Sequence, residues 1–267
     1  MREPIIIGVD HGYAAMKTAH FAFPSGLVAY EHEPYTLSNV LEYGGKFYVA
    51  GSGRQPLQKD KTQAEDYYLL TLVAIAKELA YRNAGTVADV HLAAGLPLTS
   101  FGRDKKAFRD YLCRDGKPVS FRFEGQDYAI TISKVSLYPQ GYAAVLTQSG
   151  LLNEPSVIVA DIGGWTVDLM RLDNRIPNAA TCRSLELGMI RCLDEISEQI
   201  RRSLDLSMTA AQIESVLRSD TSHVNEDAKK IIHLEAKRYT KRLLSAIAES
   251  GLDVRAIPTV FLGGGAA

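Results

Sequence analysis

The feature that most constrains the fold is a motif that occurs twice, in which a short apolar strand ends in an aspartate and a glycine-containing turn. In the first copy, Ile5–Val9 leads into Asp10–Lys17, the first glycine turn; in the second, Ser156–Ala160 leads into Asp161–Asp168, the second glycine turn. Runs of β-branched residues predict buried strands, and a further extended segment follows each turn. We therefore expect two similar halves that divide near Asn153.

Hydrophobic periodicity and turn residues predict the other elements. The expected strands are Met16–Phe23, Leu37–Tyr43 paired with Lys46–Ala50, Val90–Ala94, Val119–Phe123 paired with Tyr128–Lys134, Val167–Leu172 and Ile257–Leu262. The expected helices are Gln63–Arg82, one capped by Thr99 or Ser100 and ending near Cys113, one after a turn within Pro139–Gly150, Met189–Leu204, Thr209–Arg218 and Asn225–Ser250. This mixture predicts an α/β fold.

Composition narrows the class of protein. The chain has 267 residues and a formal net charge of -1, which gives no indication of direct nucleic-acid or membrane binding. Three scattered cysteines, Cys113, Cys182 and Cys192, favour neither a disulfide framework nor a zinc site. The apolar run Ile5–Ile7 is too short for a secretory or membrane-spanning segment, so we expect a cytoplasmic protein.

The second glycine turn has the composition of a phosphate cradle. Gly163 and Gly164 lack β-carbons, so their backbone amides are open to an anion, and Thr166 adds a hydroxyl donor. Asp161, at the end of its strand, can hold Mg²⁺ through water. The alternative for this segment is an ordinary hairpin with glycine in its turn.

The first glycine turn repeats this arrangement with Asp10, Gly12 and Lys17. Lys17 can reach a phosphate as a point charge. A surface turn with a solvated lysine is the alternative, and it is the recurrence of the motif in both halves that favours a nucleotide site. Neither turn is a Walker or Rossmann motif, because GxxxxGK[ST] is absent and each turn is followed by a strand.

Four segments resemble, in order, the phosphate, connecting and adenosine segments of the actin, Hsp70 and sugar-kinase superfamily. They are Gly8–Lys17, Ser136–Ala144, Asp161–Asp168 and Phe261–Ala266. The resemblance implies an actin-like ATPase fold in which two ribonuclease H-like domains flank a nucleotide cleft. The implied limits are 1–153 with an insertion at about 24–62, and 154–267 with an insertion at about 189–225 and no closing C-terminal helix after Ala267.

Within that superfamily the chain is most similar to the ParM/StbA group, the actin-like ATPases of plasmid segregation. This similarity implies an ATPase that binds ATP, or alternatively GTP, with Mg²⁺, and that polymerises into filaments. Its implied partners are further copies of itself and a ParR-like DNA-binding adaptor, with no direct nucleic-acid or membrane contact.

The resemblance also assigns roles to individual residues. Asp10 and Asp161 would hold the hydrated metal, and Lys17 would contact the β-phosphate. Gln140 would position the attacking water, with Asp168 as a second acidic residue for hydrolysis. The remaining predicted nucleotide contacts are Gly12, Tyr13, Gly163, Gly164, Trp165, Thr166, Gly188, Gly263, Gly264 and Gly265.

The sequence departs from the family pattern at His11 and Tyr13, where small hydroxyl residues are usual, and at Trp165, which is bulky for such a turn. Two other functions stay open. A small-metabolite kinase of the same superfamily would need a carboxylate base, for which Asp89 and Asp168 are the candidates. The other is a scaffold that binds nucleotide without hydrolysing it.

Overall fold

The computed structural model describes residues 3–36, 38–52, 60–146, 150, 153–219 and 223–266. Backbone contacts divide the chain into two units, Met1–Gln140 and Gly141–Ala267. Leu37, which starts one predicted strand, lies outside the described residues, as do parts of both predicted insertions, of the Pro139–Gly150 segment, and Ala267. The domain limits 1–153 and 154–267 stay a prediction.

The first unit contains a mixed nine-stranded sheet with the order β3-β2-β1-β7-β9-β8-β5-β6-β4. Its strands are β1 (Ile5–His11), β2 (Ala15–Lys17), β3 (Ala22–Pro24), β4 (Leu27–Tyr30), β5 (Val40–Tyr43), β6 (Lys46–Ala50), β7 (Val87–Leu96), β8 (Pro118–Phe123) and β9 (Gln126–Pro139). The two edge strands, β3 and β4, are consecutive in the chain, so the sheet curves back toward its own start.

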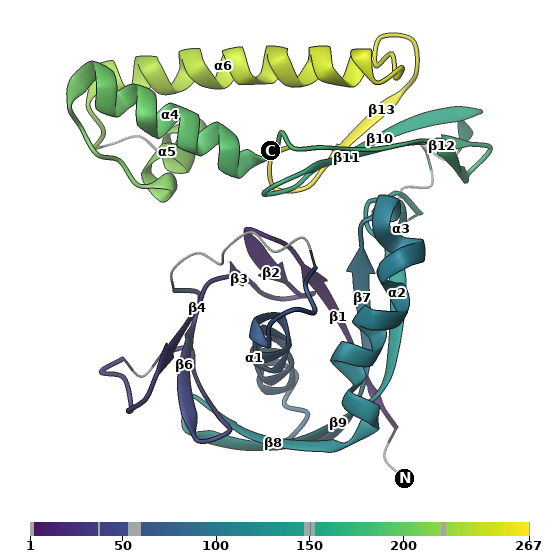
Figure 1. Ribbon diagram of the computed structural model, residues 1–267, viewed down its shortest axis with the longest axis vertical. Coiled ribbons are helices and arrows are strands. Elements are labelled where there is room, and N and C mark those ends of the chain that lie inside the picture. Colours follow the sequence, from purple (N-terminus) through teal and green to yellow (C-terminus); the bar gives the residue numbers. More distant parts are fainter. Residues whose placement is uncertain are drawn as a thin grey trace. The chain divides into compact units, whose positions relative to one another are not determined.

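This curvature explains the unusual burial of helix α1 (Asp66–Tyr81). Every residue from Tyr67 to Ala76 is buried, whereas a helix on the surface of a sheet buries only one stripe. The strands of the unit surround α1, which Figure 1 shows nearly end-on. Helix α2 (Leu98–Cys113) adds Phe108 and Leu112 to the same core.

Two expectations for the first unit were wrong, and one strand was missed. Met16–Phe23 is not one strand: Thr18 N donates to Phe21 O at 2.7 Å, which closes a turn between β2 and β3. Neither Thr99 nor Ser100 caps α2, because the helix already starts at Leu98 with Pro97 at its N-cap. Strand β4 carries no clear alternation and was not predicted. The two hairpins, β5–β6 and β8–β9, are confirmed.

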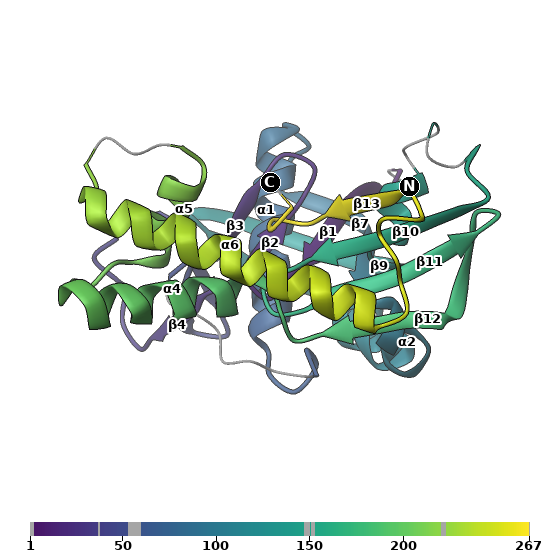
Figure 2. The ribbon, with the colours of Figure 1, turned by 90° about the horizontal axis from the view of Figure 1, so that it is seen from above.

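The second unit contains a four-stranded sheet, β12-β11-β10-β13, and three longer helices. Its elements are α3 (Tyr142–Leu146), β10 (Ser156–Ile162), β11 (Val167–Asp173), β12 (Ile176–Leu185), α4 (Met189–Leu204), α5 (Ala210–Leu217), α6 (Glu226–Glu249) and β13 (Thr259–Leu262). Ile232 and Tyr239 of α6 pack with α4 and α5, whereas Leu243 and Ile247 pack on the sheet. Helices α4 and α6 lie side by side in Figure 2.

Both units repeat one strand pattern. In the first, β1 pairs antiparallel with β2, β2 antiparallel with β3, and β1 parallel with β7. In the second, β10 pairs in the same way with β11, β11 with β12, and β10 with β13. The prediction of two similar halves is therefore confirmed at the level of topology. No helix among the described residues is long and apolar enough to cross a membrane.

Candidate functional site

The two glycine turns occupy equivalent positions in their sheets. In the first unit, Asp10 faces Lys17 and His11 faces Met16 across the hairpin. In the second, Asp161 faces Asp168 and Ile162 faces Val167. The recurrence seen in the sequence is thus a structural equivalence, in which Lys17 and Asp168 hold the same register position with opposite charge.

The carbonyl groups of the second glycine turn are bound by the N-terminus of α4. Gly188 N donates to Trp165 O at 2.9 Å, Met189 N to Gly163 O at 3.0 Å and Ile190 N to Gly164 O at 2.8 Å. The first amides of a helix have no partner within the helix, so they are available for such bonds. Gly164 and Trp165 take part in these bonds only through their carbonyl oxygens, and among the described residues their backbone amides donate to no protein group. These amides are therefore available to an anion.

Gly188 is required for this contact. A β-carbon there would lie 2.4 Å from the Trp165 carbonyl carbon and 2.5 Å from Gly164 O. Tyr239 Oη also donates to Gly188 O at 3.1 Å from α6. Gly188 was predicted to pack against the nucleotide; within its unit it packs against the turn that carries the other predicted contacts.

The remaining predicted residues of the second unit gather at the same end of β10. Thr166 Oγ1 donates to Asp168 Oδ2 at 3.2 Å, and Gly265 N donates to Ile162 O at 3.1 Å. Gly263 has a φ of +84°, and a β-carbon there would lie 2.6 Å from Asp161 Oδ1. Glycine thus lets the segment after β13 approach Asp161, at the carboxyl end of two parallel strands.

In the first glycine turn, side chains and a loop amide bind the carbonyl groups instead. Ser25 Oγ donates to Gly12 O at 2.7 Å, and Ser25 N donates to Ala14 O at 3.0 Å. Lys61 Nζ donates to His11 O. Donors within the same unit therefore bind the carbonyls of each turn. They are helix amides in the second glycine turn, and side chains with a loop amide in the first.

The side chain of His11 lies in the core of the first unit, whereas its neighbours in the turn were expected to meet phosphate. Its side chain is fully buried, and its ring packs edge-on against Phe108 at 5.2 Å between centroids. Nε2 lies 2.8 Å from Thr71 Oγ1. Because Thr71 Oγ1 donates to Tyr67 O, it accepts from His11 Nε2–H. Burial, and then the charge of Lys61, lower the pKa of His11 to about 3, so the ring is neutral.

Asp10, Lys17 and Gln140 come together at the carboxyl end of β1. Gln140 Nε2 donates to Asp10 Oδ1 at 2.6 Å, and Lys17 Nζ lies 3.6 Å from Asp10 Oδ2. Gly95 makes room for Gln140, because a β-carbon at residue 95 would lie 2.6 Å from Gln140 Cγ. The backbone fixes Gln140 as well, since Gln140 N donates to Leu96 O at 2.8 Å.

The described residues contain no cluster of three or more histidine, cysteine or acidic side chains that could bind a metal directly. The metal sites expected at Asp10 and Asp161 each consist of one carboxylate acting through water, so they stay a prediction.

Two residues of the first unit were missed from the sequence. Ser25 and Lys61 hold the first glycine turn, but no motif marks either one, because they reach the turn from the loops before β4 and before α1. Only the structure marks Lys61 as unusual, because its side chain is 7% exposed.

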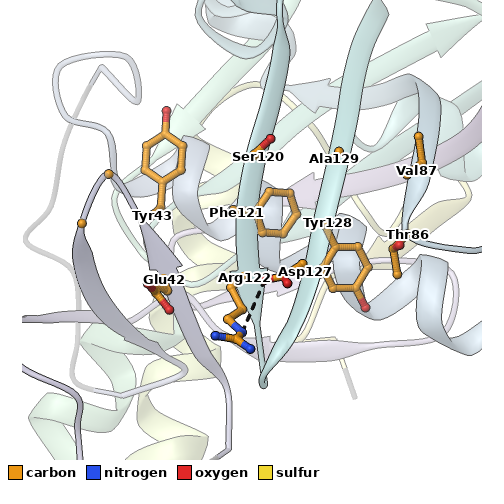
Figure 3. A pocket seen from close by; sticks show the side chains of 12 residues that line it. Glu42, Tyr43, Thr86, Val87, Ser120, Phe121, Arg122, Asp127, Tyr128 and Ala129 are labelled. Atoms are coloured by element: carbon orange, nitrogen blue, oxygen red, sulfur yellow. Dashed lines mark ion pairs between the residues drawn. The ribbon is translucent and has the colours of Figure 1, made fainter.

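A separate pocket of about 510 Å³ lies in the first unit near the β5–β6 and β8–β9 turns. Figure 3 shows Phe121 and Tyr128 side by side in its wall, with the ion pair between Arg122 and Asp127 at its edge. Val87, which also lines it, begins β7, so the pocket lies at the opposite end of the parallel strands from Asp10. It contains none of the predicted site residues.

Comparison with known proteins bears on the fold. Ta0583, an archaeal actin homologue, is 20% identical with a TM-score of 0.79, and the match covers 98% of this chain and 87% of that one. A ParM protein from a 15-stranded filament of Clostridium botulinum is 18% identical with a TM-score of 0.76, covering 99% and 89%. ParM from Bacillus thuringiensis with AMPPNP is 17% identical with a TM-score of 0.68, covering 99% and 88%. The fold is therefore the two-domain actin-like fold that the sequence predicted.

No curated protein matches the chain. A family model does: the one described as the N-terminal domain of actin-like proteins matches residues 8–142, just over half of the chain and including the first glycine turn and Gln140. By this match the chain belongs to the family of actin-like proteins.

Proposed function

We propose that the protein binds a nucleoside triphosphate with Mg²⁺ through its two glycine turns, and that bound nucleotide promotes assembly into filaments. The observation that carries this proposal is the equivalence of the turns. An aspartate is the penultimate residue of the strand before each turn, and the carbonyls of each turn are bound by donors, which favours an anion rather than a cation at the turn.

The similar structures support the same reading. Ta0583 has been solved as a complex with ADP, and the ParM of Bacillus thuringiensis with AMPPNP. The Clostridium botulinum ParM forms a filament, as does Alp12. We infer that this chain is a ParM-type protein that segregates plasmid DNA, with a DNA-binding adaptor as its partner.

In this proposal the residues of each unit have defined roles. Asp10 and Asp161 hold the hydrated metal, which neutralises phosphate charge when bound. The amides of Gly164 and Trp165 bind phosphate oxygens, and Lys17 adds a charge. Gln140 orients the attacking water, since positioning and electrostatics dominate phosphoryl transfer. The bond between Gln140 and Asp10 holds this amide at the metal-binding carboxylate.

Light scattering and phosphate release, measured together over a range of protein concentrations with ATP and Mg²⁺, test the proposal. We expect scattering above a critical concentration, accompanied by phosphate release. Nucleotide binding with neither signal would favour the scaffold. Release that requires an added metabolite would favour a kinase, although Asp89 lies near the amino end of β7, away from Asp10.

Asp161→Ala should abolish nucleotide-dependent scattering and weaken Mg²⁺–ATP binding at least about tenfold, because a metal-holding carboxylate is lost. The fold should survive, since Asp161 lies at a strand end rather than in the core. Titration of Trp165 fluorescence and thermal unfolding measure the two properties. Asp194→Ala, on the exposed side of α4, is the control and should bind as the original protein does. Normal assembly by Asp161→Ala would remove the second glycine turn from the site.

Gln140→Ala should reduce phosphate release about 100-fold, because loss of positioning alone has an effect of that order. Nucleotide affinity should stay within about threefold, because Gln140 is assigned to the water rather than to the nucleotide. Gln126→Ala, at the exposed start of β9, is the matched control. Equal losses of affinity and of turnover would instead make Gln140 a binding residue.

A further inference from the structure

The buried ammonium group of Lys61 is the least expected feature of the first unit. Its side chain is 7% exposed, and Nζ donates to the carbonyl of His11. Nζ also lies 4.9 Å from the ring centroid of Tyr13 and 5.3 Å from that of Tyr67. Burying an ammonium is costly unless polar groups surround it, and the carbonyl oxygen of His11 is one such group.

The surroundings of Lys61 hold its charge against the first glycine turn. His11 O accepts from Nζ at the end of β1, and Tyr13, whose ring faces the ammonium, belongs to the turn itself. The charge of Lys61 also affects a neighbouring group, since it contributes to the low pKa of His11. Lys61 thus contacts the turn on the side where the turn's carbonyl oxygens lie.

Comparison of the two units gives the function of this contact. In the second glycine turn, the carbonyls are bound by the N-terminus of α4, which carries a partial positive charge of about half a unit. In the first glycine turn, no helix begins among the residues that bind the carbonyls; Ser25 and Lys61 bind them instead. Lys61 therefore supplies in the first unit the positive potential that a helix N-terminus supplies in the second.

We propose that Lys61 is a positioning residue of the first glycine turn that favours ligands with a polyphosphate end, and that its contribution grows with the number of phosphates. The proposal rests on the function proposed above. It assigns Lys61 no direct contact with nucleotide: the side chain orders the turn and adds positive potential behind amides that meet the anion. It predicts discrimination between ATP, ADP and adenosine rather than a general loss of binding.

Lys61→Met tests this, because methionine keeps an unbranched stem and removes the charge. ATP binding should weaken roughly tenfold, the order expected for one unit charge acting through partly buried protein. ADP binding should weaken less, and adenosine binding should stay within about twofold of the original protein. Calorimetric titration with ATP, ADP and adenosine measures the three affinities, and raising the salt concentration should affect the variant less than the original protein.

Lys77→Met is the matched control. Lys77 lies in the same unit, and its ammonium lies 5.7 Å, 5.8 Å and 5.4 Å from the rings of Phe21, Phe23 and Phe123. It is a lysine packed on aromatic rings that lie outside the first glycine turn, so all three affinities should be unchanged. Lys61→Arg, which keeps the charge, should retain the preference for ATP even if its folding is weakened.

The outcomes separate this proposal from the one it rests on. An original protein that binds none of the three ligands overturns the proposed function, and this proposal with it. Normal binding by the original protein together with equal loss of ATP and adenosine in Lys61→Met makes Lys61 purely structural. Unchanged ATP binding in Lys61→Met, or the same loss in Lys61→Arg as in Lys61→Met, also overturns the role of the charge.

Discussion

Gly188→Ala is expected to destabilise the second unit by about 3 kcal/mol, the upper end of the usual cost of overpacking, because the neighbouring atoms are rigid. The added β-carbon would lie 2.4 Å and 2.6 Å from the carbonyl carbons of Trp165 and Gly164, and backbone cannot move aside as a flexible side chain can. The backbone of Gly188 has a φ of -72°, which any residue adopts, so the effect is steric rather than conformational.

Denaturant unfolding followed by tryptophan fluorescence measures this effect directly. Trp165 is the single tryptophan and belongs to the second glycine turn, so its emission reports the affected region. Gly264→Ala is the control: a β-carbon there meets nothing within 4 Å, so stability should change by less than about 0.5 kcal/mol. A Gly188→Ala protein as stable as Gly264→Ala would mean that α4 does not hold the turn in solution.

The stability of the first unit should fall as the pH drops below 6.5, the ordinary pKa of histidine, because the pKa of buried His11 is lowered to about 3. Below pH 6.5 the unfolded chain binds a proton that the folded chain does not, so acid favours unfolding. The loss is about 1.4 kcal/mol for each pH unit, or roughly 3 kcal/mol by pH 4.5. It continues until the folded pKa is reached.

A second buried group acts in the same direction at lower pH. Hydrogen bonds from Thr18, His20 and Arg82 outweigh burial and lower the pKa of Glu78 from 4.5 to about 2. A lowered carboxyl pKa stabilises the fold above 4.5, and that stabilisation is lost as the pH falls toward 2. Of these two groups, only His11 contributes to the slope between pH 6.5 and pH 4.5.

Calorimetric unfolding across this pH range tests the assignment, with Trp165 fluorescence identifying the transition of the second unit. His11→Gln keeps an amide donor for Thr71 and cannot titrate, so its stability should be nearly flat between pH 6.5 and pH 4.5. His32→Gln, at an exposed position, should keep the original slope. An equally steep slope in His11→Gln would assign the effect to another group.

Local sequence signals identified the elements that depend on local composition. The β-branched runs of β1 and β10 predicted strands, and the expected helix Asn225–Ser250 matches α6, which has Asn225 as its N-cap. Strand β12 was missed because its ten residues, Ile176–Leu185, are partly exposed throughout and show no alternation of polar and apolar residues. It forms because β11 offers an edge to pair with, which is a non-local condition.

The sequence by itself determined the two glycine turns and their order along the chain. These follow from short-range features: which residue ends a strand, and where glycine removes a β-carbon. Only the tertiary structure decided which residues bind the carbonyl groups of each turn. Gly188 holds the second glycine turn and Lys61 the first, while His11 lies in the core. Such contacts join residues far apart in the chain, and burial gives Lys61 and His11 their electrostatic effect, so no spacing in the sequence could reveal them.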